Sequence, residues 1–206
     1  MLTVVSGADG SGKSTIINGY SELLSDDITE VNQFWLRFVS FFSKSINMFG
    51  RILKKSYVEK HEWGTIGYHD YGGYFGYLYI FSCYIDHLLY YPIFLFNNRK
   101  SIHSDKVHHI YDRYLVDTVA DLIVDTHKDD LILWLFSGLV TSLKKKAKIV
   151  IVTCDEKVVV SRRADIYDDK KYKLRLEAFN KIAVKYKINT LDTSEGTIKE
   201  NVAGLK

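Results

Sequence analysis

The stretch Gly7-Ala8-Asp9-Gly10-Ser11-Gly12-Lys13-Ser14-Thr15 decides the fold of this 206-residue chain. Its first eight residues match the pattern G-x-x-x-x-G-K-[ST] without a mismatch. The β-branched run Leu2–Val5 predicts a strand just before it, and a helical pattern begins near Thr15. Glycines let backbone N–H groups approach phosphate oxygens closely, and the helix N-terminus adds a positive field. The stretch therefore predicts a phosphate-binding loop between a strand and a helix.

Two side chains of this loop have expected tasks. Lys13 should reach the terminal phosphates of a nucleoside triphosphate, and the Ser14 hydroxyl should ligate magnesium. We therefore expect residues 7–15 to bind ATP, with ATP and Mg²⁺ as the cofactors. The alternative is a chance glycine turn, and the flanking strand and helix argue against it.

Apolar runs alternate with helical patterns along the whole chain. Strands are predicted at Leu2–Val5, weakly around Ile28–Val31, and at Val107–Tyr111, Ile149–Thr153 and Ile188–Leu191. Helical spacing is found at Phe34–Phe49, with Phe38 among its aromatic positions, and at Leu115–Val124 and Lys170–Lys187. This alternation predicts an α/β protein with the P-loop NTPase three-layer fold: about five parallel strands with helices on both faces. With one proline and no low-complexity linker, residues 1–206 are expected to form a single domain.

The segment from Tyr68 to Phe96 carries no lysine or arginine and resembles a membrane span. Asp86 near its middle would be costly at the centre of a bilayer, and Pro92 is expected to break a continuous helix. We therefore expect a buried or dimer-packing helix, no membrane partner, and a homodimer formed through apolar helices.

Charge and cysteine usage narrow the class of protein further. The net charge of +3 is mild, and its basic runs fit solvated helix faces better than a nucleic-acid site, so no nucleic-acid partner is expected. Cys83 and Cys154 match neither a zinc pattern nor a disulfide framework, and the chain opens with a strand-like run instead of a signal peptide. A cytoplasmic protein with a small anionic substrate is the expectation.

A second motif, Asp112-Arg113-Tyr114, follows the predicted strand Val107–Tyr111. A carboxylate at the carboxyl end of a parallel strand beside a phosphate loop is placed to serve magnesium, so Asp112 and Ser14 are the metal candidates. Arg113 could clamp phosphate oxygens with two donors. Taken alone the triplet could be a surface ion pair, but its place after a phosphate loop favours the catalytic reading.

A third motif, Ser161-Arg162-Arg163-Ala164-Asp165, is followed by a polar turn to Asp169. We expect residues 161–170 to form a short lid that lowers Arg162 or Arg163 onto the transferred phosphoryl group. The alternative is a charged helix end exposed to solvent.

The acidic stripe of Asp117, Asp121 and Asp125 recurs every four residues and so shares one helix face. It fits a solvated helix face, or an acceptor cleft in which these carboxylates accept hydrogen bonds. His87 beside Asp86 could be a satisfied core histidine or an acceptor-side residue.

These motifs together resemble the thymidylate kinase family. Residues 7–15 look like its phosphate loop, Asp112-Arg113-Tyr114 like its second motif, Arg162–Arg163 like its lid, and Leu191-Asp192-Thr193 like its final strand and adenine loop. The resemblance implies that Lys13, Arg113, Arg162 and Arg163 are catalytic and that Thr193 lies by the adenine. It also implies that Asp9 faces the acceptor's sugar and Arg37 holds its phosphate, with His87, Arg113, Asp117 and Asp121 as further acceptor-side candidates.

The chain departs from the family pattern on the acceptor side. Where the family has a motif of the type Arg-Glu-Pro-Gly-Gly, this chain reads Phe34-Trp35-Leu36-Arg37-Phe38, so only Arg37 is a candidate, with a lone solvated charge as its alternative. The first hypothesis is therefore ATP-dependent phosphorylation of a nucleoside monophosphate, with thymidylate the best single acceptor. A kinase of a nucleoside or other small hydroxyl compound is the alternative, and a nucleotide-dependent switch or ATPase module is a weaker one.

Overall fold

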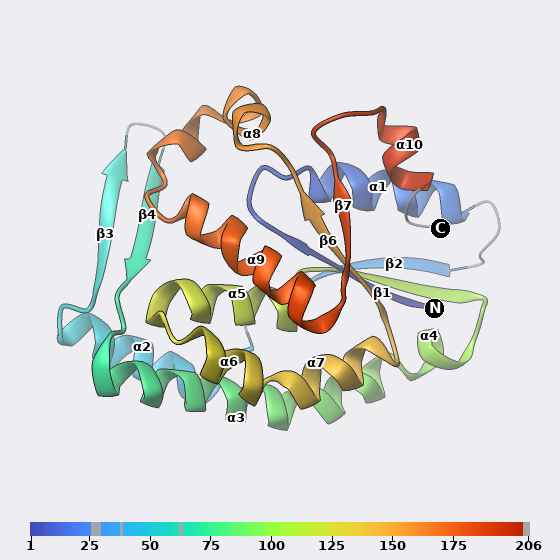
Figure 1. Cartoon of the computed structure of the whole chain (residues 1–206). Helices are drawn as coiled ribbons and strands as arrows, with labels where there is room; N and C mark the ends of the chain where they lie inside the picture. The colour runs from blue at the N-terminus through green and yellow to red at the C-terminus, as the bar shows by residue number, and fades with distance from the viewer. Residues whose placement is uncertain (26–29, 38, 62–63, 204–206) are drawn as a thin grey trace.

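Five parallel strands form the central sheet of the computed structural model, which describes residues 1–25, 30–37, 39–61 and 64–203 (Figure 1). The strands are β1 (Leu2–Gly7), β2 (Glu30–Trp35), β5 (Val107–Asp112), β6 (Lys148–Thr153) and β7 (Asn189–Asp192), in the spatial order β2-β5-β1-β6-β7. All four pairings are parallel, which confirms the predicted sheet. The weak strand predicted around Ile28–Val31 meets the start of β2, while Ile28 and Thr29 lie outside the described residues.

The central strand β1 is buried on both faces of the sheet, as expected for a parallel strand. Neighbouring residues of β1 point to opposite faces, so Val4 and Val5 belong to two different hydrophobic clusters. The cluster of Val5 contains the apolar side of α1 (Lys13–Ser25) and Val202 of α10 (Ile198–Ala203). The cluster of Val4 contains α5 (Leu115–Thr126) and α9 (Tyr172–Tyr186). Helices, sheet and helices therefore form the three predicted layers.

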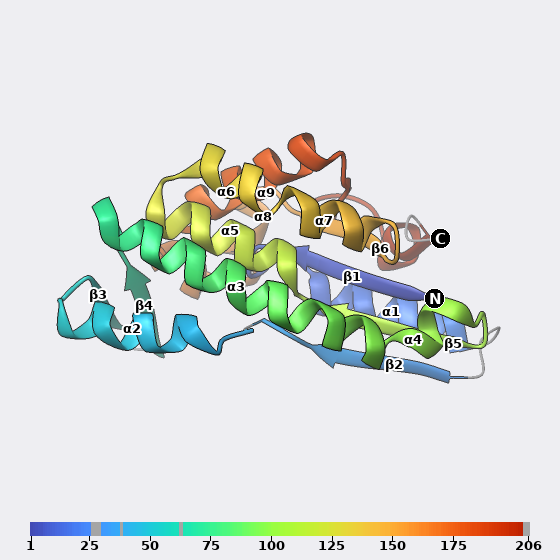
Figure 2. The same ribbon diagram turned by 90° about the horizontal axis from the view of Figure 1, so that it is seen from below.

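The remaining helices extend the α5 side of the molecule. They are α2 (Phe42–Ile52), α3 (Gly73–Asn97), α4 (Arg99–His103), α6 (Asp129–Leu135), α7 (Ser137–Lys144) and α8 (Glu156–Arg162). Figure 2 shows α3 running beside α5, which it contacts. Among the described residues, α3 is the helix that is long and apolar enough to cross a membrane by length and composition alone.

Helix α3 continues through Pro92, so the expectation that this proline would break it is wrong. A proline inside a helix removes one backbone hydrogen bond. The packing of Phe94, one half-turn further on, opposes that loss: its buried ring stacks on Tyr114 with centroids 4.2 Å apart and lies 5.0 Å from the ring of Tyr111.

The helix predicted over Phe34–Phe49 is wrong at its start. Phe34 belongs to β2, where its ring stacks on Tyr111 of the neighbouring strand, and α2 begins only at Phe42. The aromatic spacing fits a helix, but backbone pairing with β5 holds residues 30–35 extended. Phe38 lies outside the described residues.

An antiparallel hairpin, β3 (Ser56–His61) and β4 (Gly64–His69), stands apart from the main sheet and was not predicted (Figure 1). It follows α2, contacts it, and faces the end of the sheet where β1, β5 and β6 terminate.

Candidate active site

The phosphate loop spans residues 7–12 between β1 and α1, at the carboxyl end of the central strand. Gly7 has a φ of 145°, and a Cβ at this position would clash with the carbonyl oxygen of Val152 in β6. Gly10 and Gly12 also have positive φ, at 79° and 86°. These conformations are open to glycine and strained for other residues, so the three glycines of the motif are required by the backbone path.

Lys13 is buried within its own loop. Its Nζ donates a hydrogen bond of 2.6 Å to the Ala8 carbonyl. Burial, followed by the nearby charge of Arg113, lowers the Lys13 pKa to about 8. In a complex with a polyphosphate, anionic oxygens would replace the Ala8 carbonyl as the acceptor for this ammonium group, as the motif predicts.

Arg113 connects the second motif to the phosphate loop. It has a left-handed backbone, with φ of 71°, and its N–H donates to the Val5 carbonyl at 2.9 Å. Its buried guanidinium donates to Asp117 at 3.0 Å and to Asp9 of the loop. Burial opposes ionisation of Asp9, but Arg113 and Lys13 outweigh it and hold the Asp9 pKa below its usual value.

Asp112 and Ser14 fit the expected magnesium site. The Asp112 Oδ1 atom is buried and accepts no hydrogen bond from the described residues, and Ser14 is exposed in the first turn of α1. A carboxylate oxygen and a hydroxyl beside a phosphate loop are ligands that Mg²⁺ uses together with substrate phosphates and water. No group of three or more His, Cys, Asp or Glu side chains that could hold a metal ion occurs among the residues the structure describes.

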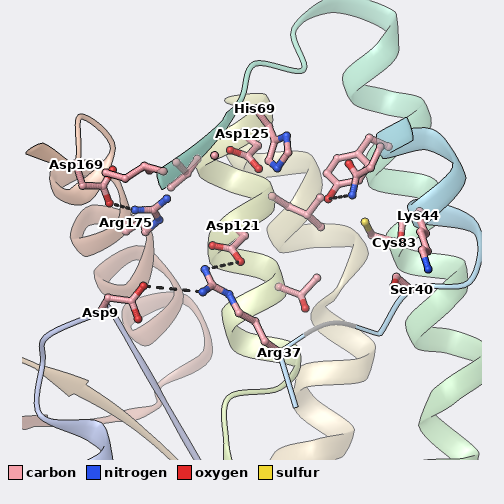
Figure 3. A pocket seen from close by; sticks show the side chains of 18 of the residues that line it. Asp9, Arg37, Ser40, Lys44, His69, Cys83, Asp121, Asp125, Asp169 and Arg175 are labelled. Carbon is pink, nitrogen blue, oxygen red and sulfur yellow. Dashed lines mark hydrogen bonds and ion pairs between the residues drawn. The ribbon is translucent and has the colours of Figure 1, made fainter. Parts of the chain in front are cut away.

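A cavity of about 610 Å³ opens beside the phosphate loop (Figure 3). Its walls come from the loop, the segment after β2, α2, β4, α5 and the segment from Arg163 to Arg175. Arg37 reaches into it between two carboxylates, 3.9 Å from Asp9 and 3.7 Å from Asp121. The structure therefore brings Arg37, Asp9 and Asp121 to one place.

The acidic stripe of α5 faces the interior, so its reading as a solvated face is wrong. Asp117 is 1% exposed and holds Arg113, although burial raises its pKa. Asp121 and Asp125 line the cavity. Asp125 accepts a hydrogen bond of 2.8 Å from Lys171, and burial raises its pKa to about 6.

The two lid arginines point to different places. Arg162 donates to the Thr193 carbonyl at 2.9 Å and contacts the Cys154 sulfur at 3.4 Å, beyond the ends of β6 and β7. Arg163 lines the cavity instead. Thr193 is buried, and its hydroxyl donates to the Ser11 carbonyl at 2.8 Å, so it supports the phosphate loop directly.

His87 is not brought to the cavity. It is 1% exposed, its ring nitrogens lie 2.9 Å from the Cys83 carbonyl and 3.3 Å from the Thr118 hydroxyl, and burial lowers its pKa. The structure places it as a core histidine, which corrects its assignment to the acceptor side. Its neighbour Asp86 is also fully buried and accepts hydrogen bonds from the first residues of α2.

Comparisons with known proteins support the architecture. No protein-family model and no curated protein matches the chain. Among solved structures, all of the chain superposes on 95% of the thymidylate kinase from Ehrlichia chaffeensis, with a TM-score of 0.55 and 16% sequence identity. The fold is thymidylate kinase-like. The chain also resembles the Bacillus subtilis YorR protein, solved in complex with phosphorylated GDP, over 100% of its own length and 93% of that protein, with a TM-score of 0.49 and 16% identity.

Several lining residues were missed by sequence reasoning. Arg175 lies in a basic run that was taken as a solvated face, yet it lines the cavity and pairs with Asp169 (Figure 3). The sequence spacing predicts on which side of α9 this residue lies. Arg175 is three residues after Tyr172 and four before Phe179, which places it on the apolar side of the helix. Other lining residues carried no motif: Lys44, Asn47, Thr65, Gly67, His69 and Tyr79.

Proposed function

We propose that this chain is a nucleoside monophosphate kinase that transfers the γ-phosphoryl group of ATP to an acceptor phosphate, with thymidylate the best single acceptor. The supporting observation is the cavity beside the phosphate loop, which is lined by three guanidinium groups, Arg37, Arg163 and Arg175. A desolvated phosphate dianion needs such cations, because burying it unpaired would cost several kcal/mol. A neutral acceptor would not need cations in the cavity.

The proposed transfer uses groups that are already in place. The loop N–H groups and Lys13 hold the triphosphate of ATP, and Arg113 is fixed beside them by Asp9 and Asp117. An acceptor phosphate oxygen attacks the γ-phosphorus while the bond to the bridging oxygen of ADP breaks, giving a nucleoside diphosphate and ADP. Ser14, and Asp112 through water, would hold Mg²⁺, which neutralises phosphate charge when bound. Arg163 would stabilise the charge on the transferred group.

Arg37 is suited to exchange partners when the acceptor binds. Its ion pairs with Asp9 and Asp121, at 3.9 and 3.7 Å, are longer than a good charge-assisted hydrogen bond. The acceptor phosphate can therefore replace Asp9 and Asp121 as the ion-pair partner of Arg37. The two carboxylates are then available to the acceptor's sugar.

The second candidate is a kinase of a nucleoside or other small hydroxyl compound. It is favoured by Asp121 and Asp125, two carboxylates in the cavity wall that could accept hydrogen bonds from hydroxyl or amino groups. In this reading Asp121→Asn is the damaging substitution and Arg37→Ala is mild.

We also propose a cytoplasmic homodimer that packs through α3. One stripe of this helix is exposed and apolar: Tyr74, Leu78, Phe81, Ile85, Leu89, Ile93 and Phe96. These positions recur at helical spacing, and a continuous apolar face of this kind is typical of an interface.

Release of ADP, measured by a coupled assay over a panel of nucleoside monophosphates and nucleosides, tests the proposed function. We expect turnover with a monophosphate and a strongly raised acceptor KM for Arg37→Ala, with the ATP KM nearly unchanged. Arg99→Ala is the matched control, because Arg99 lies over the Phe96 ring and does not line the cavity. Turnover with nucleosides alone would favour the second candidate, and acceptor-independent ADP release would favour an ATPase.

A further inference from the structure

The β3–β4 hairpin contacts the lid through a set of polar interactions. The Tyr68 hydroxyl accepts from the Lys170 backbone N–H at 3.2 Å and donates to the Asp168 carbonyl at 3.4 Å. Lys170 also pairs with Glu59 at 2.5 Å. Beside the Tyr68 hydroxyl, His61 lies 3.7 Å from Asp168, and Lys171 donates to the His69 carbonyl. All of these partners of the hairpin fall in the four residues from 168 to 171, at the end of the lid and the start of α9.

The hairpin and the lid are walls of the same cavity. Thr65, Ile66, Gly67 and His69 of β4 line it from one side. Arg163, Ile166 and Asp169 line it from the lid side. A molecule bound in the cavity would therefore touch the hairpin and the lid together.

The hairpin is also expected to need these contacts for its stability. It has two strands and makes no ladder with the main sheet, and an isolated two-stranded hairpin is marginally stable in water. The ion pair between Lys170 and Glu59 contributes little, because the lysine is largely exposed. Tyr68, by contrast, is 1% exposed, and its hydroxyl makes a part-buried link between the two walls.

We propose that Tyr68 is a positioning residue that fixes the lid, and with it Arg163, over the acceptor cavity. The lid backbone at Asp168 and Lys170 is held by the Tyr68 hydroxyl, and Arg163 sits five residues before the first of these contacts, on the cavity side. The hairpin thereby sets how far the lid can open when the acceptor enters. The expected change in kcat rests on the proposed function, but the contact between Tyr68 and the lid does not.

Tyr68→Phe tests the inference, because it keeps the ring and removes the hydroxyl. Tyr57→Phe is the matched control: Tyr57 is the cross-strand partner of Tyr68 in the same hairpin, and its side chain is half-exposed. In ligand-free protein, trypsin should cut after Lys170 and Lys171 about three- to tenfold faster in Tyr68→Phe, since local opening governs such cleavage. With ATP and the acceptor, kcat should fall about three- to tenfold, as expected for one lost hydrogen-bonding group, with an unchanged Kd for ATP.

Each outcome has a distinct meaning. Wild-type cleavage and wild-type kcat in Tyr68→Phe would overturn the inference, and so would a lowered Tm with unchanged cleavage at the lid. If the wild-type chain transfers no phosphoryl group to any acceptor, the proposed function fails, and the proteolysis comparison with Tyr57→Phe still decides whether Tyr68 holds the lid.

Discussion

Individual charged residues around the phosphate loop are held in the ligand-free protein by groups that a phosphate could replace. Lys13 rests on the Ala8 carbonyl, Arg37 lies between Asp9 and Asp121, and Arg175 is paired with Asp169. Each cation is therefore oriented without a bound anion. A substrate would exchange partners with them and would not have to pull them from solvent, which lowers the entropic cost of binding.

The lowered pKa of Lys13 makes ATP affinity depend on pH. Because a triphosphate binds the protonated amine, the Kd for ATP should be constant below about pH 8, where Lys13 is charged in the free protein. Above that pH the free protein must first take up a proton, so the Kd should rise by about tenfold per pH unit. Isothermal titration of ATP at pH 7.5 and pH 9.5 measures the effect.

Lys13→Arg is the control for this prediction, since a guanidinium stays protonated over the whole range. Its Kd should be flat with pH, whatever its absolute value. A wild-type Kd that does not change up to pH 9.5 would show that the Lys13 pKa is not lowered.

The sequence predicts the same catalytic role for either lid arginine. Because Arg162 and Arg163 have different orientations in the structure, we expect different roles for them. Arg163→Ala should lower kcat by about 10³-fold with little change in ATP affinity, because a cation in the cavity acts mainly in the transition state. Arg162→Ala should weaken ATP binding more than it lowers kcat, because Arg162 is bonded to Thr193 behind the phosphate loop. Steady-state kinetics of both variants compares them directly, and a larger kcat loss in Arg162→Ala would reverse the assignment.

The sequence predicted the path of the phosphate loop between β1 and α1 because this loop is a local structure. The glycine spacing fixes the backbone path within nine residues, so Gly7, Lys13 and Ser14 could be placed from the pattern alone. Asp125 could not be placed so easily, because its environment depends on which helices cover the sheet beside it.

At the scale of elements, α2 is fixed from outside by a residue of α3. The Asp86 carboxylate accepts from the N–H of Phe42 at 2.8 Å and from the N–H and hydroxyl of Ser43 at 2.9 and 2.6 Å. It thereby satisfies backbone donors at the start of α2, which carries the cavity residues Ser43, Lys44 and Asn47.

Asp86→Ala should lower the free energy of unfolding by about 3 kcal/mol, because it removes a charged acceptor and leaves buried N–H groups unpaired. Asp86→Asn should fall between the wild type and the alanine variant, since it keeps one acceptor oxygen. Urea unfolding followed by circular dichroism gives the three values. Equal stability of wild type and Asp86→Ala would show that this contact does not hold α2.

The sequence predicted four of the five main strands firmly and missed the hairpin, for a physical reason. Continuous apolar, β-branched runs such as Ile149–Thr153 can be recognised as buried strands from the sequence alone. The segments Ser56–His61 and Gly64–His69 are polar and glycine-containing, and their pairing is supported by α2 and the lid. The start of α2 was misplaced because aromatic spacing does not distinguish β2 from a helix.

At the scale of the molecule, strand order places the site. The sheet order β2-β5-β1-β6-β7 puts β1 at the centre, so the phosphate loop after β1 lies between Asp112 at the end of β5 and Cys154 after β6. Ligands of open parallel sheets bind at this carboxyl edge. The hairpin, α2, α5 and the lid then enclose the space in front of the loop, which is lined by three arginines and four aspartates.

The most direct test of this account follows the label from [γ-³²P]ATP after incubation with the wild-type protein, magnesium and thymidylate, with other nucleoside monophosphates and nucleosides in parallel. Lys13→Ala serves as the control that should lose transfer and keep its fold by circular dichroism, because the lysine offsets charge that grows on the phosphoryl group. The proposed phosphoryl transfer predicts label in a nucleoside diphosphate, made by the wild type and absent with Lys13→Ala. Label found only in a monophosphate made from a nucleoside, or only in inorganic phosphate, would contradict it.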